Sequence, residues 1–256
     1  MSIIALRTWY LQKYEPIKEL EKRPPDLRIS KKSLLKSGLR ADFLEDSKEV
    51  KQSTWFRRYL EGEDIEFYVE GSGSYCVANL DLISHEIYFT KQTLLAQLEP
   101  TIFFSSQLEY AEASDSLRKE LQTSINKLNE RSRWPLTFVE SYRPKEDALR
   151  LSSTMMRKIR RSLLFIADTT PITKIQQQKN VTLIPSPHVC VEIGYAIESK
   201  RTEQIVLAQM ERLELNGEYP FEWKSSQVIR FQSAKELSKA LTQTIENQLV
   251  RFKLFI

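Results

Sequence analysis

The stretch LLFIADTTP at residues 163–171 decides the fold class of this chain. Its apolar residues, 163–167, run without interruption until Asp168 and the two threonines that follow it. An uninterrupted apolar run of this length is typical of a strand buried on both faces, because helices cover both faces of a parallel sheet. The stretch therefore predicts the central strand of a parallel sheet, with Asp168 at its carboxyl end.

Further segments along the C-terminal part of the chain have the same short apolar character, and helical patterns separate them. The predicted strands are 101–105, 136–140, 204–208 and 227–231. The predicted helices are a segment with Leu117, Leu121, Ile125 and Leu128, then 146–161, 187–199, and a last helix from Ser233 with a capping box at Glu236. Strands that alternate with helices predict an α/β fold, with a five-stranded parallel, flavodoxin-like sheet and helices on both faces. By analogy we expect the strand order 2-1-3-4-5.

Residues 1–97 have a different pattern. The segment 53–60 predicts a short helix, while Ile65, Phe67 and Val69 alternate as antiparallel strands do. Ile87 and Phe89 repeat this alternation, and the stretch EGSGSY at 70–75 predicts a turn between the two segments. We therefore expect an α+β domain or extension at residues 1–97, and the α/β domain at residues 98–256.

Composition excludes several classes of function. The 256 residues contain two histidines, His85 and His188, and two cysteines, Cys76 and Cys190, without any metal-ligand spacing, so we predict no metal site and no cofactor. The net charge of +4 is too small for a dedicated nucleic-acid binder, and the basic residues within 22–40 are interspersed with acids. Neither a G-x-G-x-x-G pattern nor a P-loop is present.

The same composition bears on location. The two cysteines form no disulfide framework, which favours a reducing cytoplasm. No apolar run reaches about 18 residues, and the first residues are charged too early for a signal peptide. We therefore expect a cytoplasmic protein without a membrane segment.

Two stretches together resemble a known superfamily. FIADTTP at 165–171, followed by SPHVCVEIGYA at 186–196, is similar to the IAD-T, N-P-N-V and E-L-G-Y-A pattern of nucleoside 2-deoxyribosyltransferase-like and TIR-like proteins. FFSSQLEYAE at 103–112 is similar to the strand and small-polar loop that open those domains. The resemblance covers about residues 101–232, and residues 1–97 resemble no family that we recognise.

The resemblance implies a function and a set of site residues. Its catalytic members use the glutamate of E-L-G as nucleophile, or to stabilise the sugar cation that forms when an N-glycosidic bond breaks; here that residue is Glu192. The expected substrate-binding residues are Ser105, Ser106, Asp168, Thr169, His188 and Tyr195. The superfamily also includes non-catalytic binders, so a nucleotide-sensing or protein-interaction module is the alternative.

This sequence departs from the pattern in three places. His188 replaces the usual asparagine, the segment 172–185 lengthens the loop before the helix, and the first loop lacks the glycine of the nucleotide N-hydrolases. The missing glycine weakens the case for close backbone contact with a phosphate.

Each predicted site residue also has an ordinary structural interpretation. Glu192 lies at the edge of an apolar helical stripe, where a charged residue normally faces solvent. Asp168 suits a turn after a strand, and the serines suit a helix cap. His188 is consistent with a surface residue in the first turn of a helix, and Tyr195 with simple packing.

The sequence therefore predicts an enzyme that cleaves or transfers the N-glycosidic bond of a nucleoside, a nucleotide or NAD. Residues 1–97 would regulate access, bind a protein partner or build a homo-oligomer. A role in antiviral defence or signalling is a hypothesis that rests on the kinds of protein in which such domains occur. Nucleic-acid binding ranks lowest.

Overall fold

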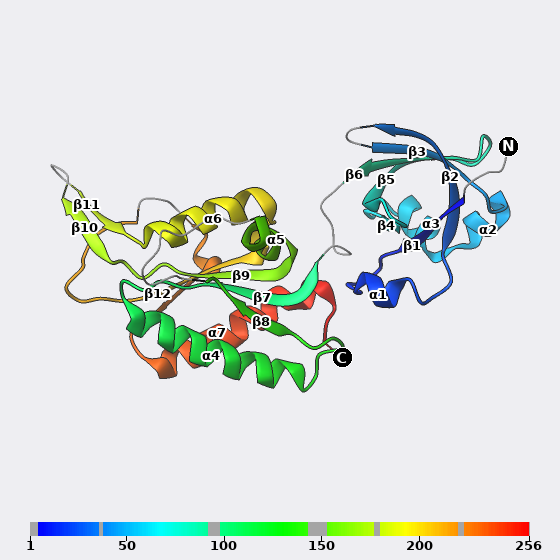
Figure 1. The fold of residues 1–256 in the computed structure, drawn as a ribbon. Helices are drawn as coiled ribbons and strands as arrows, with labels where there is room; N and C mark the ends of the chain where they lie inside the picture. Colours follow the sequence, from blue (N-terminus) through cyan, green and yellow to red (C-terminus); the bar gives the residue numbers. More distant parts are fainter. Residues whose placement is uncertain are drawn as a thin grey trace. The chain divides into compact units, whose positions relative to one another are not determined.

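The computed structural model describes residues 5–35, 38–91, 98–142, 153–176, 180–219 and 223–255. The chain divides into two compact units, Met1–Leu98 and Glu99–Ile256. Figure 1 shows the elements of both units along the chain. No helix among the described residues is long and apolar enough to cross a membrane.

Unit 1 is built on six antiparallel strands that close into a barrel in the order β1-β2-β3-β6-β5-β4. The strands are β1 (Ala5–Tyr10), β2 (Leu27–Leu35), β3 (Gly38–Phe43), β4 (Glu66–Val69), β5 (Gly73–Asp81) and β6 (Glu86–Lys91). The sequence predicted an antiparallel sheet here, but not its closure. Closure depends on the pairing of β1 with β4, because this pairing joins the two ends of the strand order.

The described part of unit 1 also contains three short helices: α1 (Ile17–Leu20), α2 (Ser47–Gln52) and α3 (Thr54–Leu60). The predicted helix at 53–60 is confirmed as α3, and Ser53 is its N-cap, with a side-chain oxygen that accepts a hydrogen bond from the Phe56 amide. Trp55 of α3 packs edge-on against Phe67 of β4, with ring centroids 5.1 Å apart. This aromatic contact anchors α3 in the barrel core.

Unit 2 contains a five-stranded parallel sheet in the order β13-β12-β9-β7-β8. The strands are β7 (Glu99–Ser105), β8 (Thr137–Glu140), β9 (Ser162–Asp168), β12 (Ile205–Met210) and β13 (Val228–Phe231). Numbered along the unit, this order is 2-1-3-4-5, so the predicted flavodoxin-like arrangement is confirmed. All seven residues of the central strand β9 are buried, as the apolar run at 163–167 predicted.

Helices cover both faces of this sheet (Figure 1). The helices α5 (Ser153–Arg161) and α6 (Pro187–Ser199) share one face, and α4 (Ala111–Asn129) and α7 (Ala234–Leu249) share the other. Ile159 of α5 and Ile193 of α6 pack with Phe165 of β9 in one buried cluster. Residues 143–152, which include the first part of the predicted helix at 146–161, lie outside the described residues. The 3₁₀ turns η2 (Thr202–Gln204), η3 (Ser225–Gln227) and η4 (Val250–Phe252) complete the unit.

The segment 172–185 is not the loop that the sequence predicted. It forms an antiparallel ribbon of β10 (Thr173–Gln176) and β11 (Val181–Ile184). The segment 211–219 extends this ribbon, because the Leu183 amide donates to the Glu218 carbonyl and the Glu218 amide donates to the Val181 carbonyl, both at 2.8 Å. Gly217 permits the close approach, since a Cβ atom at this position would lie 2.5 Å from the Val181 oxygen.

Candidate functional site at the carboxyl edge of the parallel sheet

Glu192 is completely buried, so the solvent-facing interpretation of this residue is wrong. It lies in the second turn of α6, which begins at Pro187 after Ser186, and it precedes Ile193 of the buried stripe. Carboxylates are rarely buried unless hydrogen bonds or charges compensate for the loss of water. The structure must therefore supply a partner to this side chain.

Ser105 is that partner. The Ser105 Oγ–H group donates a 2.5 Å hydrogen bond to Glu192 Oε2. Ser105 is the last residue of β7 and is itself completely buried. A hydroxyl at this distance from a carboxylate forms a short, charge-assisted hydrogen bond. The contact joins α6 to the carboxyl end of β7, where open α/β sheets bind ligands.

Asp168 ends the neighbouring strand β9 and is also completely buried. Its Oδ2 accepts from Ser114 Oγ at 2.6 Å, and its Oδ1 accepts from the Thr170 amide at 3.0 Å. Burial raises the pKa of the Asp168 carboxyl, while these hydrogen bonds oppose the rise. The contact with the Thr170 amide is the turn that the structural interpretation expected. A ligand contact by Asp168 stays a prediction.

Gln107 is a buried polar residue that the sequence analysis did not select. Its Nε2 donates to the Thr170 carbonyl at 3.0 Å, and its backbone amide donates to Ser114 Oγ at 2.9 Å. Its Oε1 is buried and has no hydrogen-bond partner among the described residues. The sequence offered one signal for Gln107, namely its position two residues after the end of the first strand of the unit.

Ser106 and Thr169 are nearly fully buried, and each is held by protein contacts. The Ser106 amide donates to Ser141 Oγ at 3.1 Å. The Thr169 amide and Oγ1 both donate to the Ala208 carbonyl, at 2.8 and 3.2 Å. The Thr169 carbonyl accepts from the Tyr219 hydroxyl, whose pKa is raised mainly by burial. These two residues thus tie the strand ends together.

His188 and Tyr195 lie on α6 with Glu192 but take ordinary positions. The His188 side chain is 48% exposed, and its Nδ1 lies 4.0 Å from Glu109 Oε1. The same Glu109 oxygen accepts from Ser186 Oγ at 3.0 Å. The partly buried Tyr195 packs against the hydrophobic cluster that α5, α6 and the sheet form. For both residues, a role toward a ligand stays a prediction.

A cavity of about 750 Å³ opens beside this site, and Thr169 is the predicted residue among its lining. It lies over β12 and β13, under the segment 211–219 and next to the ribbon. The remaining lining residues are Leu183, Leu207, Gln209, Glu211, Arg212, Leu213, Leu215, Asn216, Gly217, Glu218, Tyr219, Trp223, Val228 and Arg230. The volume suits a small-molecule ligand.

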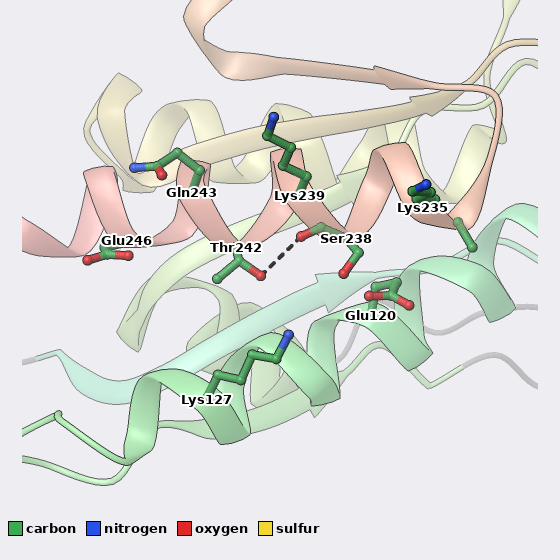
Figure 2. A pocket seen from close by; sticks show the side chains of 9 residues that line it. Glu120, Lys127, Lys235, Ser238, Lys239, Thr242, Gln243 and Glu246 are labelled. Carbon is green, nitrogen blue, oxygen red and sulfur yellow. Dashed lines mark hydrogen bonds between the residues drawn. The ribbon is translucent and has the colours of Figure 1, made fainter.

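A second cavity, of about 560 Å³, lies between α4 and α7 on the other face of the sheet (Figure 2). Lys127 and Glu120 come from α4, while Lys235, Lys239 and Glu246 come from α7. Glu246 and Lys127 lie toward one end of the groove and Glu120 and Lys235 toward the other, and none of the predicted site residues lines it. Mixed charges of this kind suit a solvated helix pair.

Metal and thiol chemistry find little support in the part of the chain that the structure describes. No group of three histidine, cysteine, aspartate or glutamate residues there could hold a metal ion. Burial raises the pKa of the Cys190 thiol, which disfavours the nucleophilic thiolate.

Comparisons with known proteins leave the family open. No family model matches the chain, and no curated protein matches it. A crystal structure of a diflavin flavoprotein A3 from Nostoc sp. is 13% identical, covers 59% of this chain and 94% of that chain, and aligns with a TM-score of 0.30. At that TM-score the likeness carries no argument about function.

Proposed function

We propose that unit 2 cleaves or transfers the N-glycosidic bond of a nucleoside, a nucleotide or NAD, with Glu192 as the carboxylate that faces the anomeric carbon. The observation that carries the proposal is the buried Glu192–Ser105 pair at the carboxyl end of β7. The resemblance of residues 186–196 to the E-L-G-Y-A pattern supports the same assignment.

The chemistry follows from what a buried carboxylate does beside a sugar. When the N-glycosidic bond breaks, its electron pair leaves with the base nitrogen, and positive charge develops on the anomeric carbon and ring oxygen. An ionised carboxylate stabilises that charge strongly where water is excluded. Water then captures the sugar in hydrolysis, or a second base captures it in transfer.

Ser105 has a positioning role in this proposal. Its hydrogen bond holds one carboxylate oxygen, Oε2, and thereby fixes the direction of the carboxylate plane. The serine therefore holds the buried carboxylate in one orientation.

A second candidate function is nucleotide sensing without catalysis. One observation favours it, namely that Glu192 is completely covered and does not line either cavity described above. A substrate must therefore displace part of the covering structure before its anomeric carbon meets the carboxylate. A binder needs no such movement.

The test is the release of free base or nicotinamide from NAD and from a panel of nucleosides and nucleotides, measured by chromatography. Glu192→Gln is expected to abolish the release while the far-ultraviolet circular dichroism stays unchanged. The matched control is Glu198→Gln, which changes an exposed glutamate of the same helix and should keep full activity. Full activity of Glu192→Gln would refute the assignment, and ligand binding without turnover would favour the sensor.

A further inference from the structure

The 750 Å³ cavity and the Glu192 carboxylate lie at different strands of the parallel sheet. Glu192 points toward Ser105 of β7. The cavity lies over β12 and β13 instead, and none of its lining residues belongs to α6. The cavity is therefore a separate place from the pair at β7.

The cavity has a floor of sheet and walls of hydrogen-bonded backbone. Leu207 and Gln209 of β12 lie on one face of the sheet, as do Val228 and Arg230 of β13, because residues two apart on a strand share a face. The segment 211–219 forms a wall, held to β11 by the two hydrogen bonds of Glu218. Such a frame is formed before any ligand arrives.

Two polar side chains in the cavity stand next to each other and are uncommitted. Gln209 and Arg230 are direct partners in the β12–β13 register. Gln209 is only 9% exposed, yet its amide makes no hydrogen bond with a described residue. Arg230 is an exposed residue, and its guanidinium forms no ion pair with another described residue. The Gln209 side-chain amide can therefore offer both a donor and an acceptor to a ligand in the cavity.

The other arginine of the cavity is already occupied, which sets Arg230 apart. Arg212 donates to the Pro171 carbonyl at 3.0 Å and lies 2.6 Å from Glu214 Oε1. Its guanidinium also stacks over the Tyr110 ring, 4.2 Å from the centroid. Arg212 is therefore held by neighbouring groups of the cavity wall, whereas Arg230 can contact a ligand.

We propose that this cavity binds a nucleotide as a second ligand, independently of the chemistry at Glu192. A carboxamide pairs two-fold with the donor and acceptor edge of a nitrogen heterocycle. The part-buried Trp223 and Tyr219 offer aromatic surface on which such a ring stacks. A guanidinium at the rim pairs with a phosphate. The base lies deep on Gln209, and the phosphate lies at the mouth on Arg230.

The experiment titrates the full chain with the four common nucleoside monophosphates and with their nucleosides, by isothermal calorimetry. At least one monophosphate should bind, with Kd in the micromolar range. Arg230→Met should weaken the monophosphate by ~10-fold or more and leave its nucleoside unchanged, because only the phosphate pairs with the guanidinium. Gln209→Leu should weaken both ligands by a similar factor.

Two control variants separate this site from the others. Glu192→Gln should leave the affinity unchanged, and so should Lys239→Met in the groove between α4 and α7. The proposal is overturned if no monophosphate binds below millimolar concentration, or if binding survives both cavity variants while they remain folded. It is also overturned if Glu192→Gln abolishes binding, which would place the ligand at β7.

Discussion

Ser105 Oγ lies 2.5 Å from Glu192 Oε2, and both side chains are completely buried. Ser105→Ala removes the donor and leaves the carboxylate without it, so we expect a loss of about 1–3 kcal/mol in the free energy of unfolding. Urea denaturation of Ser105→Ala, Glu192→Gln and the double variant gives the coupling energy of the pair.

Ser199→Ala is the control for the Ser105 experiment. Ser199 Oγ donates to the Tyr195 carbonyl one turn earlier in α6, at 2.8 Å. Such a local contact adds little stability to a helix, so the loss should stay within about 0.5 kcal/mol. Equal losses for the two serine variants would contradict a special role of the Glu192 contact.

Asp168 predicts a pH dependence of stability. Its pKa is raised above the ordinary value of 3.8, so the folded chain binds this proton more tightly than the unfolded chain does. The stabilisation is present in acid and is lost as the pH rises from 3.8 through the raised pKa. Relative to Asp168→Asn, the wild type should therefore lose stability over that window. Denaturation midpoints between pH 3 and pH 8 measure the difference, and a constant difference would contradict the raised pKa.

Lys200 predicts a second pH dependence of stability, at alkaline pH. Burial lowers its pKa from 10.5 to about 7, and its Nζ donates to the Ser162 carbonyl at 2.5 Å. Between these two values the unfolded chain holds the proton and the folded chain does not, so stability increases with pH in that window. Lys200→Met should remove this rise, whereas Lys239→Met, on an exposed side of α7, should keep it. Parallel curves for the wild type and Lys200→Met from pH 7 to pH 10 would refute the assignment.

Two glycines of unit 2 should respond to alanine in opposite directions. A Cβ at Gly217 would lie 2.5 Å from the Val181 oxygen, and that oxygen also accepts from the Glu218 amide. Gly217→Ala should cost about 1–3 kcal/mol, as overpacking does. Gly194 of α6 has open space around its Cβ position, so Gly194→Ala should stabilise the chain by about 0.5–1 kcal/mol. Thermal unfolding of both variants tests the contrast, and the same sign for both would contradict it.

The parallel sheet was readable from the sequence because its signal is local. The run at 163–167 is apolar at every position, as is typical of a strand covered on both faces. The apolar repeats of the last helix, Leu237, Leu241, Ile245 and Leu249, are all buried as their spacing predicted. These features depend on periodicity alone.

The ribbon, the barrel closure and the burial of Glu192 depend on contacts between distant residues. The ribbon at 173–184 is exposed along β10, so no apolar pattern marks it. Glu192 is buried by a serine 87 positions earlier in the chain, and helical spacing cannot reveal such a partner. The cavity over β12 and β13 arises in the same way, because its wall is an irregular segment that docks on the ribbon.

Closure of the barrel also affects which strands can pair with strands of another molecule at high protein concentration. Each of the six described strands has a neighbour on both sides, so none of them is an edge strand along its whole length. The unpaired amides and carbonyls of an edge strand recruit strands from other molecules. Within the described strands of the two large sheets, β8 and β13 are the open edges. Intermolecular strand pairing, where it occurs, should therefore begin at β8 or β13 of unit 2. The closed barrel of unit 1 should not take part in it.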